Sequence, residues 1–153
     1  MRDIGRVGQV LAIPGDSGGV SVRMTSRIGG QMIRWLPAVS WMGLIFYLSA
    51  QPDLPHHPQG MVDLILKKAG HMAEYGVLAG LIWWAWPRSG ERGAQRCFVG
   101  ALVLSLLYAV SDEVHQVFVL GRSARLLDVG FDLLGALLAL LFLSFLVGWR
   151  ESL

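Results

Sequence analysis

The chain is poor in cysteine and in charge. Among its 153 residues there is one cysteine, Cys97, which excludes an internal disulfide and a cysteine-built zinc site. Charged residues make up only 16% of the chain, whereas an ordinary soluble domain carries about 25%. Hydrophobic residues reach 54%, so the chain lacks the polar surface that it would need to fold in water. Its length is enough for one domain and not for two.

The chain also lacks the charge pattern of a nucleic-acid-binding protein. Its formal net charge is only +2. The basic residues stand at the ends of apolar runs and do not form a stripe along one face, as a nucleic-acid footprint requires. We therefore expect no nucleic-acid partner.

Residues 1–31 have no helical period and are rich in glycine and serine, with scattered arginines. Their apolar stretch, VGQVLAIPG, is too short and too broken for the core of a signal peptide. The sequence predicts a disordered, basic, glycine-rich tail over 1–31 and a membrane domain over 32–150. Met24 and Met32 both precede the first long apolar segment, so a downstream start codon is a hypothesis that amino-terminal sequencing of the native protein would test.

Four apolar segments follow, over 35–50, 69–86, from 97 onward, and 129–149. Each has about the 17 to 25 residues that an α-helix needs to cross a bilayer. The helices of a soluble bundle would each need a polar face, and these segments have none. The sequence therefore predicts an all-α integral membrane four-helix bundle.

Most of the Lys and Arg residues lie on one side of this predicted bundle. The more basic side carries nine residues: Arg2, Arg6, Arg23, Arg27, Arg34, Arg88, Arg92, Arg96 and Arg150. The other side carries four: Lys67, Lys68, Arg122 and Arg125. Because Lys and Arg collect in cytoplasmic loops, we expect both termini to be cytoplasmic. The margin depends on the four arginines that precede Arg34.

Ionisable residues of three segments fall at one depth. At a rise of about 1.5 Å per residue, the following lie in the outer third of the membrane: His71, Glu74, Asp112, His115 and Asp132. Charges at this depth are costly unless they pair or line a wet cavity. We expect the second, third and fourth segments to form a polar pocket that is open to the outside.

Helical spacing sharpens this prediction, because residues three or four apart share a face. The shared faces hold Lys68, His71 and Tyr75, with Glu74 beside them; Ser111, Asp112, His115 and Gln116; and Asp128 and Asp132. Glu113 points off to a side of the third segment.

Two histidines and neighbouring carboxylates can supply a general acid and base. The candidate catalytic residues are His71, Asp112, Glu113 and His115. Alternatively, His71, His115 and one of the two carboxylates would bind a divalent metal with an open position. The D-x-x-H spacing is also common in plain hydrogen-bonded pairs, so the sequence assigns neither a metal nor a cofactor.

The loop between the third and fourth segments contains two arginines, Arg122 and Arg125. Gly121 permits a tight turn before Arg122. An arginine fork at the mouth of the pocket suits a phosphate or carboxylate, and we favour this role for Arg122. For Arg125 we favour interfacial anchoring or pairing with Asp128.

Three motifs resemble the VanZ-like family of small bacterial membrane proteins. They are SAQP at 49–52, KAGHMAEYGVLAG from Lys68, and SDEVHQVFVLGRSARLLDVGFDLLGA from Ser111. The resemblance covers about 35–145. The chain departs from the usual pattern at Lys67, where the family has an acidic or neutral residue, and at Leu120, where it has a proline.

The resemblance implies a multi-pass protein of the bacterial cytoplasmic (inner) membrane and an association with low-level teicoplanin resistance, but no reaction. The polar positions that it carries over are Lys68, His71, Tyr75, Ser111, Asp112, Glu113, His115, Gln116, Arg122, Asp128 and Asp132. The expected partners are membrane lipid and a lipid-linked envelope precursor or a lipoglycopeptide.

Three hypotheses for function remain open. The pocket is an enzyme site for a lipid-linked or lipoglycopeptide substrate, a binding site in which no bond is broken, or a structural cluster that ties the helices together. Interhelical hydrogen bonds in membranes contribute less than about 2 kcal/mol each, so a purely structural role would be an inefficient use of so many charges.

Overall fold

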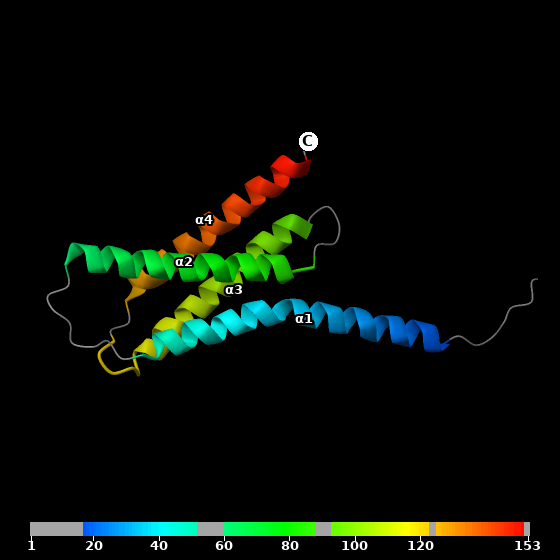
Figure 1. Ribbon diagram of the computed structural model, residues 1–153, viewed down its shortest axis with the longest axis horizontal. Helices are drawn as coiled ribbons and strands as arrows, with labels where there is room; N and C mark the ends of the chain where they lie inside the picture. Colours follow the sequence, from blue (N-terminus) through cyan, green and yellow to red (C-terminus); the bar gives the residue numbers. More distant parts are fainter. Residues whose placement is uncertain (1–16, 52–59, 88–92, 123–124, 152–153) are drawn as a thin grey trace, which may run out of the picture.

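The computed structural model describes residues 17–51, 60–87, 93–122 and 125–151 (Figure 1). These residues form four α-helices and no strand: α1 (Ser17–Ser49), α2 (Met61–Ala85), α3 (Gly93–Gln116) and α4 (Leu126–Glu151). The predicted all-α, four-helix architecture is confirmed.

Three of the helices contain segments long and apolar enough to cross a membrane, namely Gly30–Ser49 in α1, Gly93–Gln116 in α3 and Leu126–Gly148 in α4. Large apolar side chains stay exposed along them, for example Leu107 at 60% and Phe142 at 61%, as expected where lipid covers the surface. The chain is therefore a membrane protein. Helix α2 is equally long but carries Lys68, His71 and Glu74, so its crossing of the membrane stays a prediction.

Helix α1 begins at Ser17 and so extends into 1–31, where the sequence predicts a disordered tail. Adding residues to an existing helix is much easier than nucleating one, so an apolar helix can continue into a polar segment. Residues 1–16 lie outside the described part of the chain. The domain boundary near residue 31 stays a prediction.

Helix α2 packs most closely against α4, and Figure 1 shows the two helices crossing. Glycine makes this approach possible. A Cβ added at Gly135 would lie 2.1 Å from the carbonyl oxygen of Met72, and one added at Gly76 would lie 3.3 Å from the carbonyl oxygen of Gly135. Small residues at a membrane helix crossing let the two backbones come together. Tyr75 and Leu78 are fully buried near this crossing.

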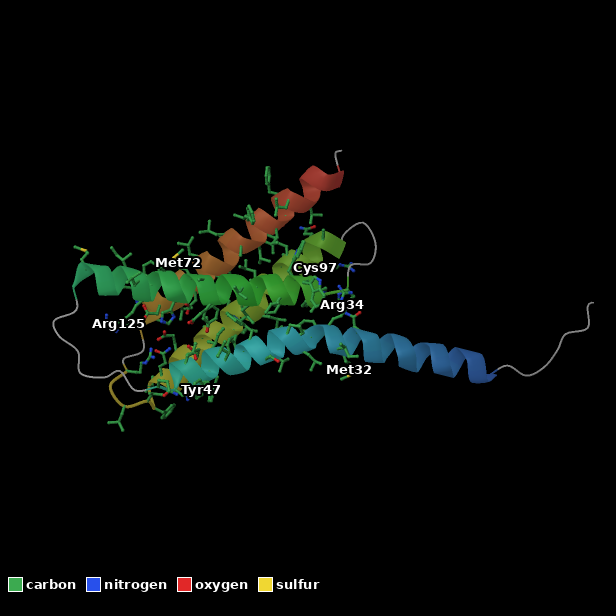
Figure 2. All side chains as sticks on the ribbon, in the orientation of Figure 1. Met32, Arg34, Tyr47, Met72, Cys97 and Arg125 are labelled. Atoms are coloured by element: carbon green, nitrogen blue, oxygen red, sulfur yellow. The ribbon has the colours of Figure 1, made fainter. Side chains whose placement is uncertain are left out.

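The carboxyl end of α2 is held by α1. Gln31 Nε2 donates a hydrogen bond to the Ala85 carbonyl at 3.0 Å, and Arg34 Nη2 donates one to the Trp84 carbonyl at 2.8 Å. These donors satisfy carbonyls that have no partner within the helix. Figure 2 shows Arg34 and Cys97 at this end of the bundle and Tyr47 and Arg125 at the other. We call the latter the polar end, because the candidate site residues gather there.

Candidate functional site

Two ion pairs join α2 to α4. Lys68 Nζ contacts Asp128 Oδ1, and His71 Nδ1 lies 3.2 Å from Asp132 Oδ1. The Asp132 side chain is only 1% exposed, and a buried carboxylate needs an opposite charge or hydrogen-bond donors nearby. For Arg125 the sequence left open interfacial anchoring or pairing with Asp128. In the structure the side chain of Asp128 pairs with Lys68, and its backbone N–H donates a hydrogen bond to the Arg125 carbonyl.

A small hollow, which we call the polar pocket, lies beside these ion pairs. Its volume is about 70 Å³. It is lined by Ile45, Leu48, Ser49, His71, Glu74, Asp112, Gln116 and Arg122. A water molecule needs about 10–15 Å³ of such space. The pocket therefore has room for a few waters or one small polar group.

The helices that form the polar pocket differ from those that the sequence predicts. Helix α1 contributes lining residues in place of α4. The carboxylates of α4 face α2 in the two ion pairs, and α1 is fixed against α2 and α3. Trp41 Nε1 donates to the Glu74 carbonyl at 2.9 Å, and the Tyr108 hydroxyl donates to the Met42 carbonyl at 2.5 Å.

Two oxygens in the lining of the polar pocket have no hydrogen-bond partner among the described residues. They are Asp112 Oδ1 and Ser49 Oγ, both buried. The second oxygen of Asp112 accepts a hydrogen bond from Gln116 Nε2 at 3.0 Å. An unsatisfied buried polar group costs about 1–3 kcal/mol. The pocket thus offers acceptors to a ligand that carries donors.

Arg122 both lines the polar pocket and holds the end of α1. Its Nε donates to the Gln51 carbonyl at 3.2 Å and its Nη2 donates to the Leu48 carbonyl at 3.3 Å. Gly121, with φ of +80°, makes the turn that brings Arg122 there, as the sequence predicts. Because two of its donor groups contact the last turn of α1 and the residues just after it, the phosphate or carboxylate fork expected of Arg122 stays a prediction.

Ser111 and His115 lie outside the lining of the polar pocket. Ser111 is exposed, and its hydroxyl donates to the Tyr108 carbonyl at 2.8 Å. The ring of His115 stacks on Phe46, with 4.3 Å between the centroids. The structure therefore does not place Ser111 as a nucleophile that His115 could activate.

Two other candidates face elsewhere. Glu113 points to the side of α3 that approaches α4, where its Oε2 accepts a hydrogen bond from the Arg125 backbone N–H at 2.7 Å. Tyr75 is fully buried, with its ring 6.2 Å from that of Tyr108. Of the candidate catalytic residues, only His71 and Asp112 line the polar pocket.

The described residues contain no group of three or more His, Cys, Asp and Glu side chains that could hold a metal ion. The two histidines that the sequence offered as metal ligands contact different residues: His71 lies against Asp132, and His115 stacks on Phe46. Neither histidine is presented to a common centre.

Sequence reasoning missed Ser49 as a residue of the polar pocket. Its side chain is 6% exposed, and its hydroxyl has no partner within the described ranges. The available signal was its place in the SAQP motif, directly after the first apolar segment. Depth alone did not single it out, because serine is not ionisable.

The fold and site define a small all-α membrane protein with two ion pairs and a polar pocket at one end of its bundle. A family model described as VanZ/LLP1 matches residues 17–147. The chain therefore belongs to the VanZ/LLP1 family. No curated protein and no solved structure matches it.

Proposed function

We propose that the chain is a multi-pass protein of the bacterial inner membrane whose polar pocket faces the outer leaflet and binds an envelope ligand. The ligand is a lipid-linked precursor or a glycopeptide, and its binding lowers susceptibility to teicoplanin. Membership of the VanZ/LLP1 family and the three apolar helices support the membrane setting. The chemistry of the pocket supports the class of ligand.

The observation that carries this proposal is the pair of unpartnered oxygens, Asp112 Oδ1 and Ser49 Oγ. Glu74 adds a further carboxylate to the lining. Carboxylate oxygens accept hydrogen bonds and do not donate them when ionised. An amine or hydroxyl group of the ligand fits such a pocket better than a phosphate does, since two donor groups of Arg122 already bind the Leu48 and Gln51 carbonyls.

Binding fits the geometry better than catalysis does. A hydrolytic or transfer reaction needs a nucleophile within hydrogen-bond reach of a base. Ser111 donates to its own helix backbone, and the ring of His115 stacks on Phe46. His71 lies against Asp132. These contacts favour a site that holds a polar group without breaking a bond.

A purely structural cluster is the alternative. The pairs Lys68–Asp128 and His71–Asp132 do tie α2 to α4. However, a cluster that served only to join helices would be expected to satisfy its own buried polar groups. Asp112 Oδ1 is left over among the described residues, and this favours binding.

Expression in a teicoplanin-susceptible Gram-positive host tests the proposal. The wild-type chain should raise the inhibitory concentration of teicoplanin. Asp112→Asn should return it to the value of the empty vector, because the amide keeps the shape but presents no negative charge. The control Leu107→Ala removes an exposed apolar side chain from the same helix and should keep full resistance.

Protein levels in the membrane decide between binding and structure. Under our proposal, Asp112→Asn is present at the wild-type level and is inactive. A variant that loses both protein and resistance would support the structural alternative. Full resistance in Asp112→Asn would refute the proposed pocket.

A further inference from the structure

A second hollow lies between α3 and α4, on the side of α3 to which Glu113 points. We call it the α3–α4 groove. Its volume is about 260 Å³. It is lined by Val110, Glu113, Val114, Val117, Arg125, Leu126 and Val129. It shares no lining residue with the polar pocket.

The walls of the groove are apolar and open to the surroundings of the protein. Val110 and Val114 lie one turn apart on α3, and Val117 directly follows its last residue. Each of the three is about half exposed. Leu126 is exposed at the start of α4. In a membrane protein, such a surface is in contact with lipid chains. A hydrocarbon chain lying in the groove would cover these side chains.

One buried acidic side chain interrupts this apolar wall. Glu113 is 6% exposed, and its Oε2 accepts the hydrogen bond from the Arg125 backbone N–H. Its Oε1 is buried and has no hydrogen-bond partner in the part of the chain that the structure describes. An unpartnered carboxylate oxygen in apolar surroundings is costly. A ligand in the groove that carries a hydrogen-bond donor would satisfy it.

We propose that the α3–α4 groove binds one phospholipid with a zwitterionic, primary-amine headgroup. An acyl chain lies along Val110, Val114 and Val117. The ammonium group donates a hydrogen bond to Glu113 Oε1. The side chain of Arg125, which also lines the groove, meets the phosphate.

Charge and size both select this occupant. The polar part of the lining holds one acid and one base, Glu113 and Arg125, which together complement a zwitterion. The volume is close to the lower end of small-molecule sites, about 300–1,000 Å³, and therefore suits one lipid chain with its headgroup at the rim. The polar end of the bundle, where Arg125 lies (Figure 2), is where a headgroup is expected.

Native mass spectrometry of the detergent-solubilised full chain tests this assignment. The probe is phosphatidylethanolamine, compared with phosphatidylcholine of the same acyl chains, whose trimethylammonium group has no N–H to donate. One tightly bound phosphatidylethanolamine per chain is expected. Because a hydrogen bond to a charged group is among the stronger ones, phosphatidylcholine should bind at least about tenfold more weakly.

Two substitutions separate the contact of the groove with the acyl chain of the lipid from its contact with the headgroup. Val114→Trp fills the groove and should remove the tightly bound lipid. The matched control Val103→Trp, at a similarly exposed valine of α3 outside the groove, should retain it. Glu113→Gln removes the negative charge. This variant should bind the two lipids about equally, because only its affinity for phosphatidylethanolamine falls relative to the wild type.

Three results would overturn the proposal. One is equal lipid occupancy in Val114→Trp and Val103→Trp. Another is an equal preference of the wild-type chain for the two headgroups. The third is a dimer that Val114→Trp dissociates and Val103→Trp does not, which would assign the groove to a second copy of the chain. Each result is independent of teicoplanin resistance, so failure here leaves the function of the polar pocket untouched.

Discussion

Two carboxylates of α4 lie opposite two basic side chains of α2, and the burial of the two pairs differs. In the pair Lys68–Asp128, both side chains keep contact with the surroundings, at 21% and 13% exposure. In the pair His71–Asp132, the aspartate is almost fully buried. The low dielectric of the interior strengthens a paired charge and raises the cost of an unpaired one. Asp132 therefore depends on His71 more than Asp128 depends on Lys68.

A double-mutant cycle measures this dependence. His71→Ala and Asp132→Ala should each lower the stability of the detergent-solubilised protein. The first leaves Asp132 buried without an opposite charge, and the second leaves the partly buried His71 without its partner. The double variant should be less destabilised than the sum of the single variants, by about 1–2 kcal/mol. Unfolding followed by circular dichroism in mixed micelles gives the three free energies.

A distant site provides the control for this cycle. Leu146 is a partly exposed residue in the last part of α4. His71→Ala and Leu146→Ala should add to within about 0.5 kcal/mol. Additive free energies for His71 and Asp132 as well would show that the two side chains do not interact.

Part of the geometry of this site can be predicted from the sequence, and particular residues show where such a prediction stops. Helical spacing places Lys68 and His71 on one face, and the structure pairs both with α4. Spacing fixes an angle about the helix axis but not the neighbour that this angle faces. For this reason the polar stripe of α3 divides in the structure: Asp112 and Gln116 line the polar pocket, while His115 meets Phe46 of α1.

At the scale of the helices, the crossing of α2 and α4 is the tightest of the glycine contacts, as judged by the space available for a Cβ at each glycine. At Gly135 the backbone of Met72 occupies the position that a side chain would take. Figure 2 shows Met72 beside this crossing. Membrane helices gain little from burying apolar surface against each other, so close packing of small residues supplies much of their association. This crossing also sets the separation at which the two ion pairs form.

Gly135→Ala should destabilise the bundle. The added Cβ would meet the Met72 carbonyl oxygen at 2.1 Å, and a backbone atom cannot move aside without shifting α2. Overpacking of this kind costs about 1–3 kcal/mol, so the thermal midpoint of the purified protein should fall.

Gly130→Ala is the matched control on the same helix. A Cβ added at Gly130 meets nothing within 4 Å. Alanine is the better helix former, by up to about 1 kcal/mol, so this variant should melt at or slightly above the wild-type temperature. Identical midpoints for the alanine variants at 135 and 130 would contradict the close crossing.

The helix boundaries were less predictable than the helices themselves. The apolar segment over 69–86 becomes a helix that begins at Met61, and that over 35–50 becomes one that begins at Ser17. Hydropathy marks the part of a helix that suits lipid, whereas backbone hydrogen bonding continues through polar residues such as Lys67 and Lys68. The structure therefore extends the predicted segments mainly at their amino-terminal ends.

At the scale of the whole molecule, the site residues gather at one end because the helices alternate in direction. The carboxyl ends of α1 and α3 lie at the polar end with the beginning of α4 (Figure 1). Arg122 links this end together, since it follows α3 and donates to the Leu48 carbonyl in the last turn of α1 and to the Gln51 carbonyl just beyond it. A polar cluster at one end of a membrane bundle has access to one leaflet. Which leaflet that is depends on the orientation of the chain.

Labelling of single cysteines tests both the orientation and the crossing of α2. Cys97 is buried, and Cys97→Ala gives a background without cysteine. Gln51→Cys and Pro87→Cys then place one thiol on each side of α2, at exposed positions. If both termini are cytoplasmic, as the excess of arginine predicts, a membrane-impermeant maleimide added to intact cells should label the cysteine at 51 alone.

Labelling at 87 alone would show that the protein has the opposite orientation, with the polar pocket facing the cytoplasm. Equal labelling at both positions would mean that α2 does not cross the membrane, and the ion pairs Lys68–Asp128 and His71–Asp132 would then hold it against the helices that do.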